Sequence, residues 1–363
     1  MKKALIVTTI QDTVESFLIP HIELLEKNGF EVWIATNIYR ELPEKLKKNK
    51  WINISFKRNP FSICVFKAIG EMKELFHRNK FELVHFHTPV ASFLGRYAAN
   101  KKGQKNIFYT AHGFHFYRGA PILNWLIYYP LEKIAAKWTD YLITINEEDF
   151  QIGKKILGNR GEVYKVDGVG LNLKEYRDGC RDRLRKELKI QEDEIAVTII
   201  GELNSNKNQI QLIKALKILR DRGKKVKGII VGDGENRDSL KKVCGEKDIL
   251  FLGFRKDIKD IIASSDILVS MSYREGLPRN IMEGMAQGKP FIVTDIRGNR
   301  DIIEDGVNGF LVPVGDEKIT ANKIEELFNE ELRERIGKNN IESVEKFSIE
   351  KILHEMGMKY ELL

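Results

Sequence analysis

The feature that most constrains the fold is an alternation of short apolar, β-branched runs with segments of helical periodicity, repeated in two series along the chain. Such alternation is typical of βαβ units, in which helices cover a parallel sheet. The first series of predicted strands comprises residues 4–9, 31–36, 51–55, 83–86, 106–110, 141–145 and 162–166. The second comprises residues 195–200, 226–231, 249–252, 267–270, 291–294 and 310–312. The pattern predicts an α/β protein with two doubly wound domains that face each other across a cleft.

Length and composition agree with two domains. The chain has 363 residues, 42% hydrophobic and 31% charged, which is typical of a globular protein and excludes a disordered or fibrous one. A polar, arginine-rich stretch at 168–190 interrupts the alternation and is interpreted as a connector. We predict an N-terminal domain over 1–167, a C-terminal domain over 168–345 and a last helix over 346–363 that packs back on the N-terminal domain.

The net charge and the cysteine content restrict the partners and the cellular compartment expected for the chain. Lys and Arg number 60 against 52 Asp and Glu, a net charge of +8 that favours nucleic acid, phosphorylated small molecules or an anionic membrane surface as partners. The three cysteines show no disulfide or zinc-ligand spacing, which fits a reducing cytosol. No run reaches the ~18 apolar residues of a membrane span. The most apolar aromatic stretch, 121–130, is long enough only to lie against a bilayer.

The stretch 273–290 carries the most information about function. Pro278 is predicted as the first residue of a helix and Gly288 as the residue just after its end. Glu275 then lies in the loop before the helix, and Glu283 lies inside it. A capping acid and a solvated helix glutamate are the alternative interpretation of this pair.

This helix start is suited to a nucleoside diphosphate. Backbone N–H groups near the N-terminus of a helix favour an anion such as a diphosphate. The groups in question belong to Gly276, Leu277 and Arg279. Glu283 would lie about 8 Å farther along the axis, within reach of a ribose diol. Glu275 would lie on the other side of the diphosphate, where a carboxylate could accept hydrogen bonds from a sugar.

Glu275 and Glu283, within Glu-Gly-Leu-Pro and Met-Glu-Gly-Met-Ala, resemble the E-x7-E motif of the retaining glycosyltransferases of family 4. Members of that family have two Rossmann-like domains in the GT-B arrangement, and the resemblance covers essentially the whole chain. It implies that Glu275 holds the hydroxyls of the donor sugar and that Glu283 holds the ribose of the nucleotide.

Lys207 stands after the predicted strand 195–200, at the N-terminus of a predicted helix, which is the unfavourable end for a cation. A bound anion would remove that conflict, and an exposed lysine in a frayed turn is the alternative. The resemblance implies that Lys207 contacts the donor diphosphate. The family usually has an arginine just after the glycine that ends this strand, whereas this chain has Glu202. A second basic group, with Arg279 as a candidate, must then come from elsewhere, or the donor is held differently.

Gly232 and Gly234 follow another predicted strand. They fail the dinucleotide-binding pattern because Arg237 stands where a third glycine is needed, but they resemble the family's glycine turn near the donor. Phe254 lies in a segment that resembles the border of the nucleobase site. A place in the hydrophobic core is the alternative for this side chain.

His112 follows a strand of the first series and resembles the family's active-site histidine, which implies contact with the donor sugar. A hydrogen-bonded structural histidine is the alternative. His85 and His87 stand two apart on a strand and point the same way. No third ligand and no Asp-x-Asp pair accompany them, so we assign His87 a structural or acceptor-side role and expect no metal. Thr9 and Arg118 are weaker acceptor-side candidates.

Residues 113–125 are dense in aromatic side chains. They resemble a subgroup that builds capsular or exopolysaccharide repeat units and related oligosaccharides on polyprenyl diphosphate. Apolar surface would suit the lipid, and basic residues would suit its diphosphate and anionic headgroups. The basic residues considered are Lys45, Lys47, Lys48, Lys50, Lys57 and Arg58. Core aromatics beside a solvated lysine-rich face are the alternative.

Residues and resemblance together predict a retaining, metal-independent glycosyltransferase that moves a sugar from a nucleoside-diphosphate sugar, with UDP as the expected nucleotide, to a polyprenyl-diphosphate-linked saccharide. The predicted catalytic residues are His112, Lys207 and Glu275. We expect no cofactor, no nucleic-acid partner, and a cytoplasmic, peripheral position on an anionic inner membrane surface. The alternatives are a UDP-sugar 2-epimerase of the same architecture and a non-catalytic nucleotide-sugar-binding protein. A nicotinamide oxidoreductase is disfavoured because no G-x-G-x-x-G opens either half.

Overall fold

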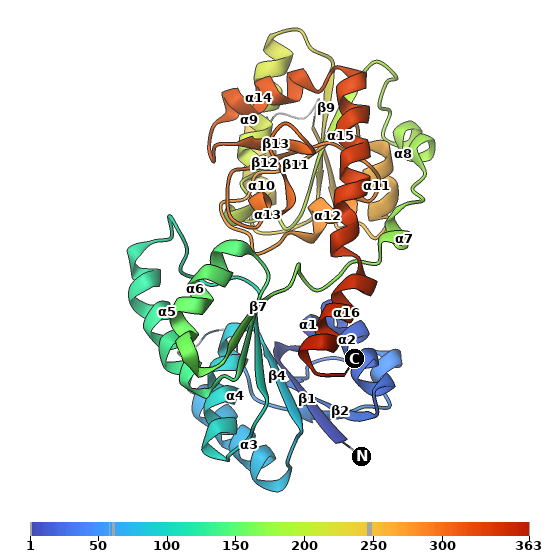
Figure 1. Cartoon of the computed structure of the whole chain (residues 1–363). Coiled ribbons are helices and arrows are strands. Elements are labelled where there is room, and N and C mark those ends of the chain that lie inside the picture. The colour runs from blue at the N-terminus through green and yellow to red at the C-terminus, as the bar shows by residue number, and fades with distance from the viewer. Residues whose placement is uncertain (1, 58, 60–61, 245–248, 363) are drawn as a thin grey trace. The chain divides into compact units, whose positions relative to one another are not determined.

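The computed structural model of the chain describes residues 2–57, 59, 62–244 and 249–362 (Figure 1). The chain divides into two compact units. Unit one consists of Met1–Gly170 together with Ile349–Leu363, and unit two is Leu171–Ser348. Each unit contains one parallel sheet with helices packed on it, so the predicted pair of doubly wound α/β domains is confirmed.

In unit one, the described residues form a seven-stranded parallel sheet with the order β3-β2-β1-β4-β5-β6-β7. Its strands are β1 Lys2–Ile10, β2 Phe30–Asn37, β3 Lys50–Asn53, β4 Leu83–His87, β5 Ile107–Ala111, β6 Tyr141–Thr144 and β7 Glu162–Lys165. All seven were predicted from the sequence. The strand order reverses between β1 and β4, and the loops that leave the carboxyl ends of these two strands diverge there, as at the ligand-binding crevice of doubly wound sheets.

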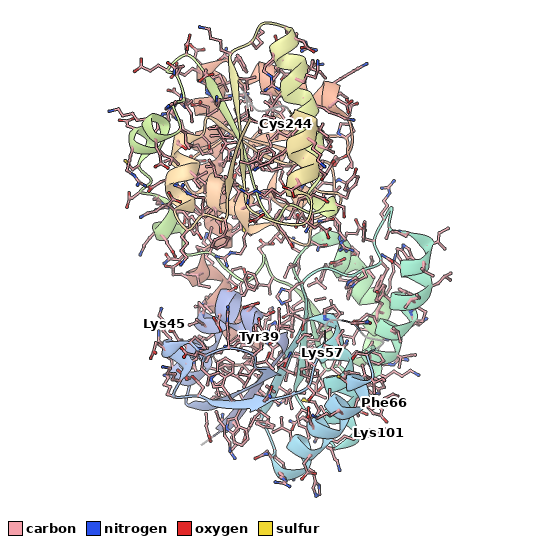
Figure 2. All side chains as sticks on the ribbon, turned by 180° about the vertical axis from the view of Figure 1, so that it is seen from behind. Tyr39, Lys45, Lys57, Phe66, Lys101 and Cys244 are labelled. Atoms are coloured by element: carbon pink, nitrogen blue, oxygen red, sulfur yellow. The ribbon has the colours of Figure 1, made fainter. Side chains whose placement is uncertain are left out.

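The helices of unit one cover both faces of this sheet. They are α1 Gln11–Thr13, α2 Ile19–Lys27, α3 Cys64–Arg78, α4 Pro89–Lys101, α5 Ile122–Ala135, α6 Glu147–Leu157 and α16 Ile349–Lys359. Figure 1 shows α3, α4 and α5 along one face and α2 and α16 along the other, and the two buried hydrophobic clusters agree with this division. Phe66, in the first turn of α3, is exposed (Figure 2).

The last helix, α16, packs on unit one, as predicted. Ile352 and Met356 are buried and stand four residues apart, so they lie on one face of the helix and join a cluster with Leu18 and Ile22. The hydroxyl of Tyr360, just after α16, hydrogen-bonds to Nδ1 of a β4 histidine, His85, over 2.5 Å. The chain end is therefore tied to the strand that carries the histidine pair.

Unit two contains a parallel sheet with the order β10-β9-β8-β11-β12-β13. Its strands are β8 Ile195–Ile200, β9 Val226–Val231, β10 Ile249–Gly253, β11 Ile267–Ser270, β12 Phe291–Thr294 and β13 Gly309–Val312. Its helices are α7 Leu173–Tyr176, α8 Arg181–Glu187, α9 Gln209–Asp221, α10 Arg237–Cys244, α11 Ile258–Ser264, α12 Arg279–Met285, α13 Asn299–Ile302, α14 Glu317–Glu326 and α15 Glu330–Ser343. Each strand of the second predicted series is present.

The interpretation of residues 168–190 as a connector was wrong for most of its length. It contains α7 and α8, which belong to unit two. Arg181 and Arg185 of α8 donate to the carboxylate of Asp266 at 2.7 Å and 3.0 Å, and Asp266 also accepts the backbone N–H of Ala196 at 2.8 Å. The arginines that look like solvated linker residues in the sequence therefore attach α8 to the amino ends of the central strands β8 and β11. Arg185 is only 8% exposed.

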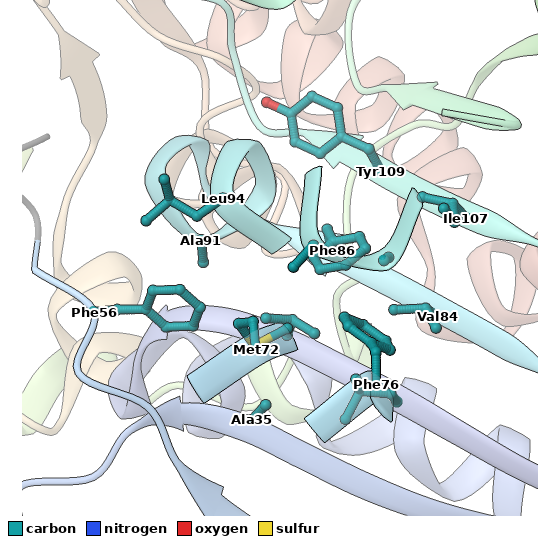
Figure 3. Packing of buried hydrophobic residues seen from close by; sticks show 14 of the residues in the cluster. Ala35, Phe56, Met72, Phe76, Val84, Phe86, Ala91, Leu94, Ile107 and Tyr109 are labelled. Atoms are coloured by element: carbon teal, nitrogen blue, oxygen red, sulfur yellow. The ribbon is translucent and has the colours of Figure 1, made fainter. Parts of the chain in front are cut away.

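The core of unit one requires close approach between a helix and the sheet. Phe86 of β4 is fully buried among residues of α3 and α4, including Met72 and Phe76 (Figure 3). A Cβ atom on Gly95 of α4 would lie 2.1 Å from the Phe86 ring. The absence of a side chain at Gly95 therefore allows α4 to pack directly against the Phe86 ring.

Two glycine substitutions test this packing. Gly95→Ala is expected to lower the free energy of unfolding by about 1–3 kcal/mol, because the added methyl group overpacks against Phe86. Gly70→Ala, at an exposed position of α3 with nothing within 4 Å of the new Cβ, is expected to raise it by about 0.5–1 kcal/mol. Chemical denaturation of both variants measures the difference. Equal stability of the two variants would contradict the packing described here.

Candidate active site

A lysine and a glutamate meet in unit two. Lys207 lies in the 3-10 turn Ser205–Lys207 after β8, and Glu275 lies in the loop after β11. Nζ of Lys207 donates to Oε1 of Glu275 over 2.6 Å, and Oγ of Ser272 donates to the same oxygen over 2.7 Å. The two ionic side chains are 24% and 14% exposed, so their charges interact more strongly than those of a solvated surface pair.

Backbone contacts hold these two loops together. The backbone N–H of Tyr273 donates to the carbonyl of Asn206 at 2.8 Å, and the Asn206 amide donates to the carbonyl of Arg274 at 3.0 Å. Asn208, in the left-handed conformation with φ of 50°, separates the turn of Lys207 from the start of α9 at Gln209. The anion beside Lys207 in this structure is thus a carboxylate of the chain, and the two predicted catalytic groups touch each other.

The helix of the E-x7-E segment is α12, which begins one residue later than predicted. Pro278 is extended, with ψ of 119°, and is the N-cap rather than the first helical residue. The helical conformation begins at Arg279, since the ring of Pro278 fixes φ but leaves ψ free to be extended. Gly288 has φ of +65° and closes the turn that follows the helix, three residues after the last helical residue, Met285, rather than directly after it.

Glu283 of α12 has a partner that sequence reasoning missed. The Tyr176 hydroxyl, from α7, donates to Oε1 of Glu283 over 3.1 Å, and Nε of Arg279 lies 3.8 Å from the same oxygen. Burial raises the pKa of Glu283, while Arg279 and the Tyr176 hydrogen bond oppose that rise. A single tyrosine in a charged segment carries no sequence signal for this contact, which joins positions 107 apart.

The glycine turn lies directly against the loop of Lys207. Gly232 has φ of +130°, and a Cβ there would lie 2.0 Å from the carbonyl oxygen of Gly201. A Cβ on Gly234 would lie 2.5 Å from the carbonyl oxygen of Leu203. Both glycines are thus needed for the loops after β8 and β9 to touch, whether or not a ligand is bound.

The side chains of Phe254 and Glu202, near the glycine turn, are exposed. Phe254, just after β10, is 75% exposed, so a place in the core is excluded for it. Glu202, which stands where the resemblance implies an arginine, accepts a hydrogen bond from the side chain of Asn204 at 3.0 Å. Gly276 and Leu277 stand in the loop between Glu275 and α12.

Unit one brings the predicted histidines together. His112 follows β5, and its Nε2 lies 3.1 Å from Nδ1 of His87, at the end of β4. The rings of His85 and His87 are 4.0 Å apart between centroids, which confirms that they share a face of the strand. His85 also hydrogen-bonds Thr110 through Nε2 at 2.7 Å. Burial lowers the pKa of His112 to about 4 and those of His85 and His87 well below the ordinary value. These imidazoles are therefore neutral at pH 7.

Thr9 supports the turn that follows β4. Its backbone N–H and Oγ1 lie 2.9 Å and 2.7 Å from Oγ1 of Thr88. Thr88 has φ of +66°, an unfavourable conformation for a β-branched residue, and Pro89 begins α4 directly after it. Thr9 is buried and holds this strained turn beside His87.

The aromatic stretch 113–125 is largely part of the core. Phe114 and Phe116 are buried with rings stacked at 4.8 Å, and Trp125 packs on the same cluster. For these aromatics the alternative interpretation, core packing, is the right one. Arg118 is exposed, and its backbone N–H donates to Glu148 at 2.5 Å.

The lysine-rich segment is partly engaged within unit one. Lys47 pairs with Glu44, Lys48 pairs with Glu26 at 2.6 Å, and the Lys50 ammonium lies 3.7 Å from the Trp33 ring centroid. Arg58 lies outside the described residues. Among the residues that the structure describes, no group of three or more His, Cys, Asp or Glu is arranged to hold a metal ion. In the same residues no helix has the length and apolar character needed to traverse a bilayer.

Comparison with known proteins decides the class. Residues 7–146 match the family described as Glycosyl transferase 4-like, and residues 181–343 match Glycosyl transferases group 1. EpsD of Bacillus subtilis (strain 168), which carries the name of a glycosyltransferase, is 36% identical over 99% of this chain and 96% of its own. The chain belongs to the family 4-like glycosyltransferases.

This glycosyltransferase is also similar to a curated relative and to a solved structure. The UDP-Gal:alpha-D-GlcNAc-diphosphoundecaprenol alpha-1,3-galactosyltransferase of Escherichia coli is 30% identical over 80% of each chain. The crystal structure of Anabaena HepE in complex with UDP and glucose has a TM-score of 0.80 over 100% of both chains, at 20% identity. This second likeness concerns the fold.

The glycosyltransferase carries two groups of predicted site residues. Unit two joins Lys207 and Glu275 directly, and Glu283 lies on the helix that follows. Unit one joins His112 to His87. Arg118 takes part in neither of these contacts. Ser272 and Tyr176 are additions from the structure, and the first could have been found as a hydroxyl three residues before Glu275.

Acid pH tests the burial of His112. On unfolding, its pKa returns from about 4 to its ordinary value of about 6.5, so the unfolded chain binds more protons between these values. The contribution of neutral His112 to the free energy of unfolding is therefore complete above pH 6.5 and is lost as the pH falls toward 4. His112→Gln is expected to make this loss shallower, by about one proton taken up on unfolding. The measurement is the urea midpoint between pH 4.5 and 8, with exposed His354→Gln as the control. Slopes that coincide for wild type and His112→Gln would refute the burial.

Proposed function

We propose that this glycosyltransferase is a retaining, metal-independent enzyme that transfers a sugar from a UDP-sugar to a polyprenyl-diphosphate-linked saccharide in the assembly of a bacterial surface polysaccharide or glycan. The observation that carries the proposal is the contact between Lys207 and Glu275. It sets a cation beside a hydrogen-bond acceptor at the carboxyl ends of two adjacent strands. A glycosyl phosphate presents the matching pair, an anionic phosphate next to a hydroxyl-bearing sugar.

In this proposal Lys207 neutralises the donor diphosphate, and Glu275 accepts hydrogen bonds from the sugar hydroxyls. Glu275 is already held by Lys207 and Ser272, which suits a positioning role better than that of a covalent nucleophile. Glu283 binds the ribose, since its largely buried carboxylate is kept in place by Tyr176. Phe254, exposed beside the glycine turn, offers an aromatic face to the base.

The chemistry assigned to the site is largely electrostatic. Breaking the bond between the anomeric carbon and the diphosphate oxygen leaves positive charge at that carbon. The acceptor hydroxyl forms the new bond from the face that the diphosphate leaves, and its proton passes to the departing diphosphate. Lys207 stabilises the negative charge that develops on the departing diphosphate. His112, a neutral imidazole held by His87, contributes a hydrogen bond to the donor sugar rather than a charge.

The acceptor and location rest on other observations. The name of the Escherichia coli relative specifies both a UDP-sugar donor and a diphosphoundecaprenol-linked acceptor, which supports the same two substrate classes here. A lipid-linked acceptor is confined to the membrane, and the net charge of +8 favours an anionic membrane surface. We therefore place the enzyme as a peripheral protein at the inner face of the cell membrane.

Calorimetric titration with UDP, GDP, ADP and NAD, first with EDTA and then with Mg²⁺, tests the donor assignment. Selective binding of UDP that does not require Mg²⁺ is expected. Transfer from a UDP-sugar to a polyprenyl-diphosphate saccharide, with the anomeric configuration retained, then tests the reaction. An isomerised UDP-sugar formed without any acceptor would instead identify a 2-epimerase. Binding of UDP with neither reaction would leave a nucleotide-sugar-binding protein.

Replacing the lysine tests leaving-group stabilisation. Lys207→Ala is expected to lower turnover on the order of 100-fold or more, because the developing diphosphate charge loses its cation. Lys214→Ala, an exposed lysine on α9, is the matched control and should turn over like wild type. Steady-state rates at saturating donor measure the effect. Near-normal turnover of Lys207→Ala would remove this lysine from the mechanism.

Replacing the second glutamate tests ribose binding. Glu283→Ala is expected to weaken UDP binding about 10- to 100-fold, as hydrogen bonds to a charged group contribute about 1.5–3 kcal/mol. Tyr176→Phe should weaken it less, by about 3- to 10-fold, because it removes one neutral donor and leaves the carboxylate. Calorimetry gives both dissociation constants. A Glu283→Ala enzyme that binds UDP normally but turns over poorly would contradict a ribose-only role.

A further inference from the structure

Helix α5 exposes an apolar face that the fold of unit one leaves uncovered. Ile122, Leu123 and Leu126 are 77%, 64% and 68% exposed, and Leu131 and Ile134 are 38% and 44% exposed. Residues 122, 126, 130 and 134 follow each other at intervals of four, so they form a stripe along one side of the helix. Pro130 is exposed within it. A monomeric soluble protein rarely presents so continuous an apolar surface without a binding role.

The opposite side of α5 fixes the direction in which this stripe points. Trp125, Tyr128 and Tyr129 pack against the core of unit one. Glu132 forms an ion pair at 2.9 Å with Arg96, which is buried in α4 and also donates to Thr139. Rotating α5 to hide the stripe would leave Arg96 as an uncompensated buried charge, so the stripe is held outward.

The charges around the stripe are suited to an anionic surface. Glu132 is the one acidic residue in the sequence of α5, and it faces Arg96 rather than solvent. Lys133 and Lys137 are exposed at the end of the helix, and Arg118 is exposed before its start. A helix with an apolar face and flanking cations is the form that lies in the interface of an anionic bilayer.

A second pair of exposed apolar side chains lies on another helix of unit one. Ile63 and Phe66, at the start of α3, are 88% and 80% exposed. Figure 2 labels Phe66 on this helix. Helices α3 and α5 both pack against α4 on the same face of the sheet. The layer of helices on this side of unit one thus carries large apolar groups toward solvent at two places.

We propose that the exposed face of α5, defined by Ile122, Leu123, Leu126, Pro130, Leu131 and Ile134, docks the enzyme on an anionic phospholipid bilayer. The inference rests on the proposed function in one respect, since a lipid-linked acceptor gives the enzyme a reason to be at a membrane. In the docked state the aliphatic side chains enter the boundary between headgroups and acyl chains. Arg118, Lys133 and Lys137 meet the anionic headgroups.

The test is co-sedimentation of the full chain with vesicles, in the absence of any substrate. Wild type is expected to bind vesicles of phosphatidylcholine with 30 mol% phosphatidylglycerol, and to bind pure phosphatidylcholine at least ~10-fold more weakly. Ile122→Gln/Leu126→Gln should reduce binding to the anionic vesicles at least ~10-fold, because two large aliphatic groups no longer enter the bilayer. Val243→Gln/Val307→Gln, which alters two exposed apolar residues of unit two, is the matched control and should bind like wild type.

Three results would overturn the proposal: no binding of wild type to anionic vesicles, equal binding of the α5 double variant, or equal binding to neutral and anionic vesicles. Light scattering tests the other candidate occupant of the α5 face, which is a second copy of the chain. A wild-type dimer that the α5 substitutions convert to a monomer would identify the face as an interface between two copies. UDP titration of each variant separates the two hypotheses. Loss of vesicle binding with normal UDP binding concerns α5 alone, whereas a wild type that docks on vesicles but binds no UDP contradicts the proposed function.

Discussion

Parallel strand pairing is the constraint on which the rest of this structure depends. Each strand of a parallel sheet must be followed by a crossover, so the loops that leave the carboxyl ends of all strands collect along one edge. In unit two this edge brings together the loops after β8 and β11, with Lys207 and Glu275 in contact. In unit one it brings together the ends of β4 and β5, with His87 and His112 in contact. Residues that are distant in sequence become neighbours for this topological reason.

Partial burial gives these contacts their chemical character. Lys207 and Glu275 are shielded enough to interact strongly, yet remain open enough for a ligand to reach them. His85 and His87 of unit one are buried more deeply, and desolvation lowers the pKa of both and of the half-buried His112, which keeps all three neutral at pH 7. One group of residues therefore offers charge, and the other offers hydrogen bonds without charge. The proposed function assigns the charged group to the donor diphosphate and the uncharged hydrogen-bonding group to the donor sugar.

The same fold separates the aromatic from the aliphatic residues of α5 and the segment before it. Phe116, Trp125 and Tyr129 face the core, where their rings pack edge to face or tilted. Ile122, Leu123, Leu126, Leu131 and Ile134 face solvent. The Arg96–Glu132 pair fixes this choice, because it can form only when α5 presents Glu132 to α4. A stretch that reads as uniformly apolar in the sequence thus has two sides with different roles.

The sequence by itself determined the strands, their division into two sheets and the helix of the E-x7-E segment. These features depend on local patterns: β-branched runs, Pro and Gly at helix ends, and apolar residues four apart. The start of α12 at Arg279 rather than Pro278 is a local detail that proline leaves open. The positions of Glu275, Glu283 and Lys207 relative to strand and helix ends were likewise predictable.

Tertiary structure decided which of these residues touch. Lys207 and Glu275 are 68 positions apart, Tyr176 and Glu283 are 107 apart, and His85 and Tyr360 are 275 apart. A periodic pattern records which side of an element is apolar, but not which distant polar group completes a buried carboxylate or imidazole. It also could not tell that Arg181 and Arg185 bind Asp266, nor which side of α5 faces outward. Those outcomes depend on the packing of whole elements, where an unpaired buried charge is too costly to remain.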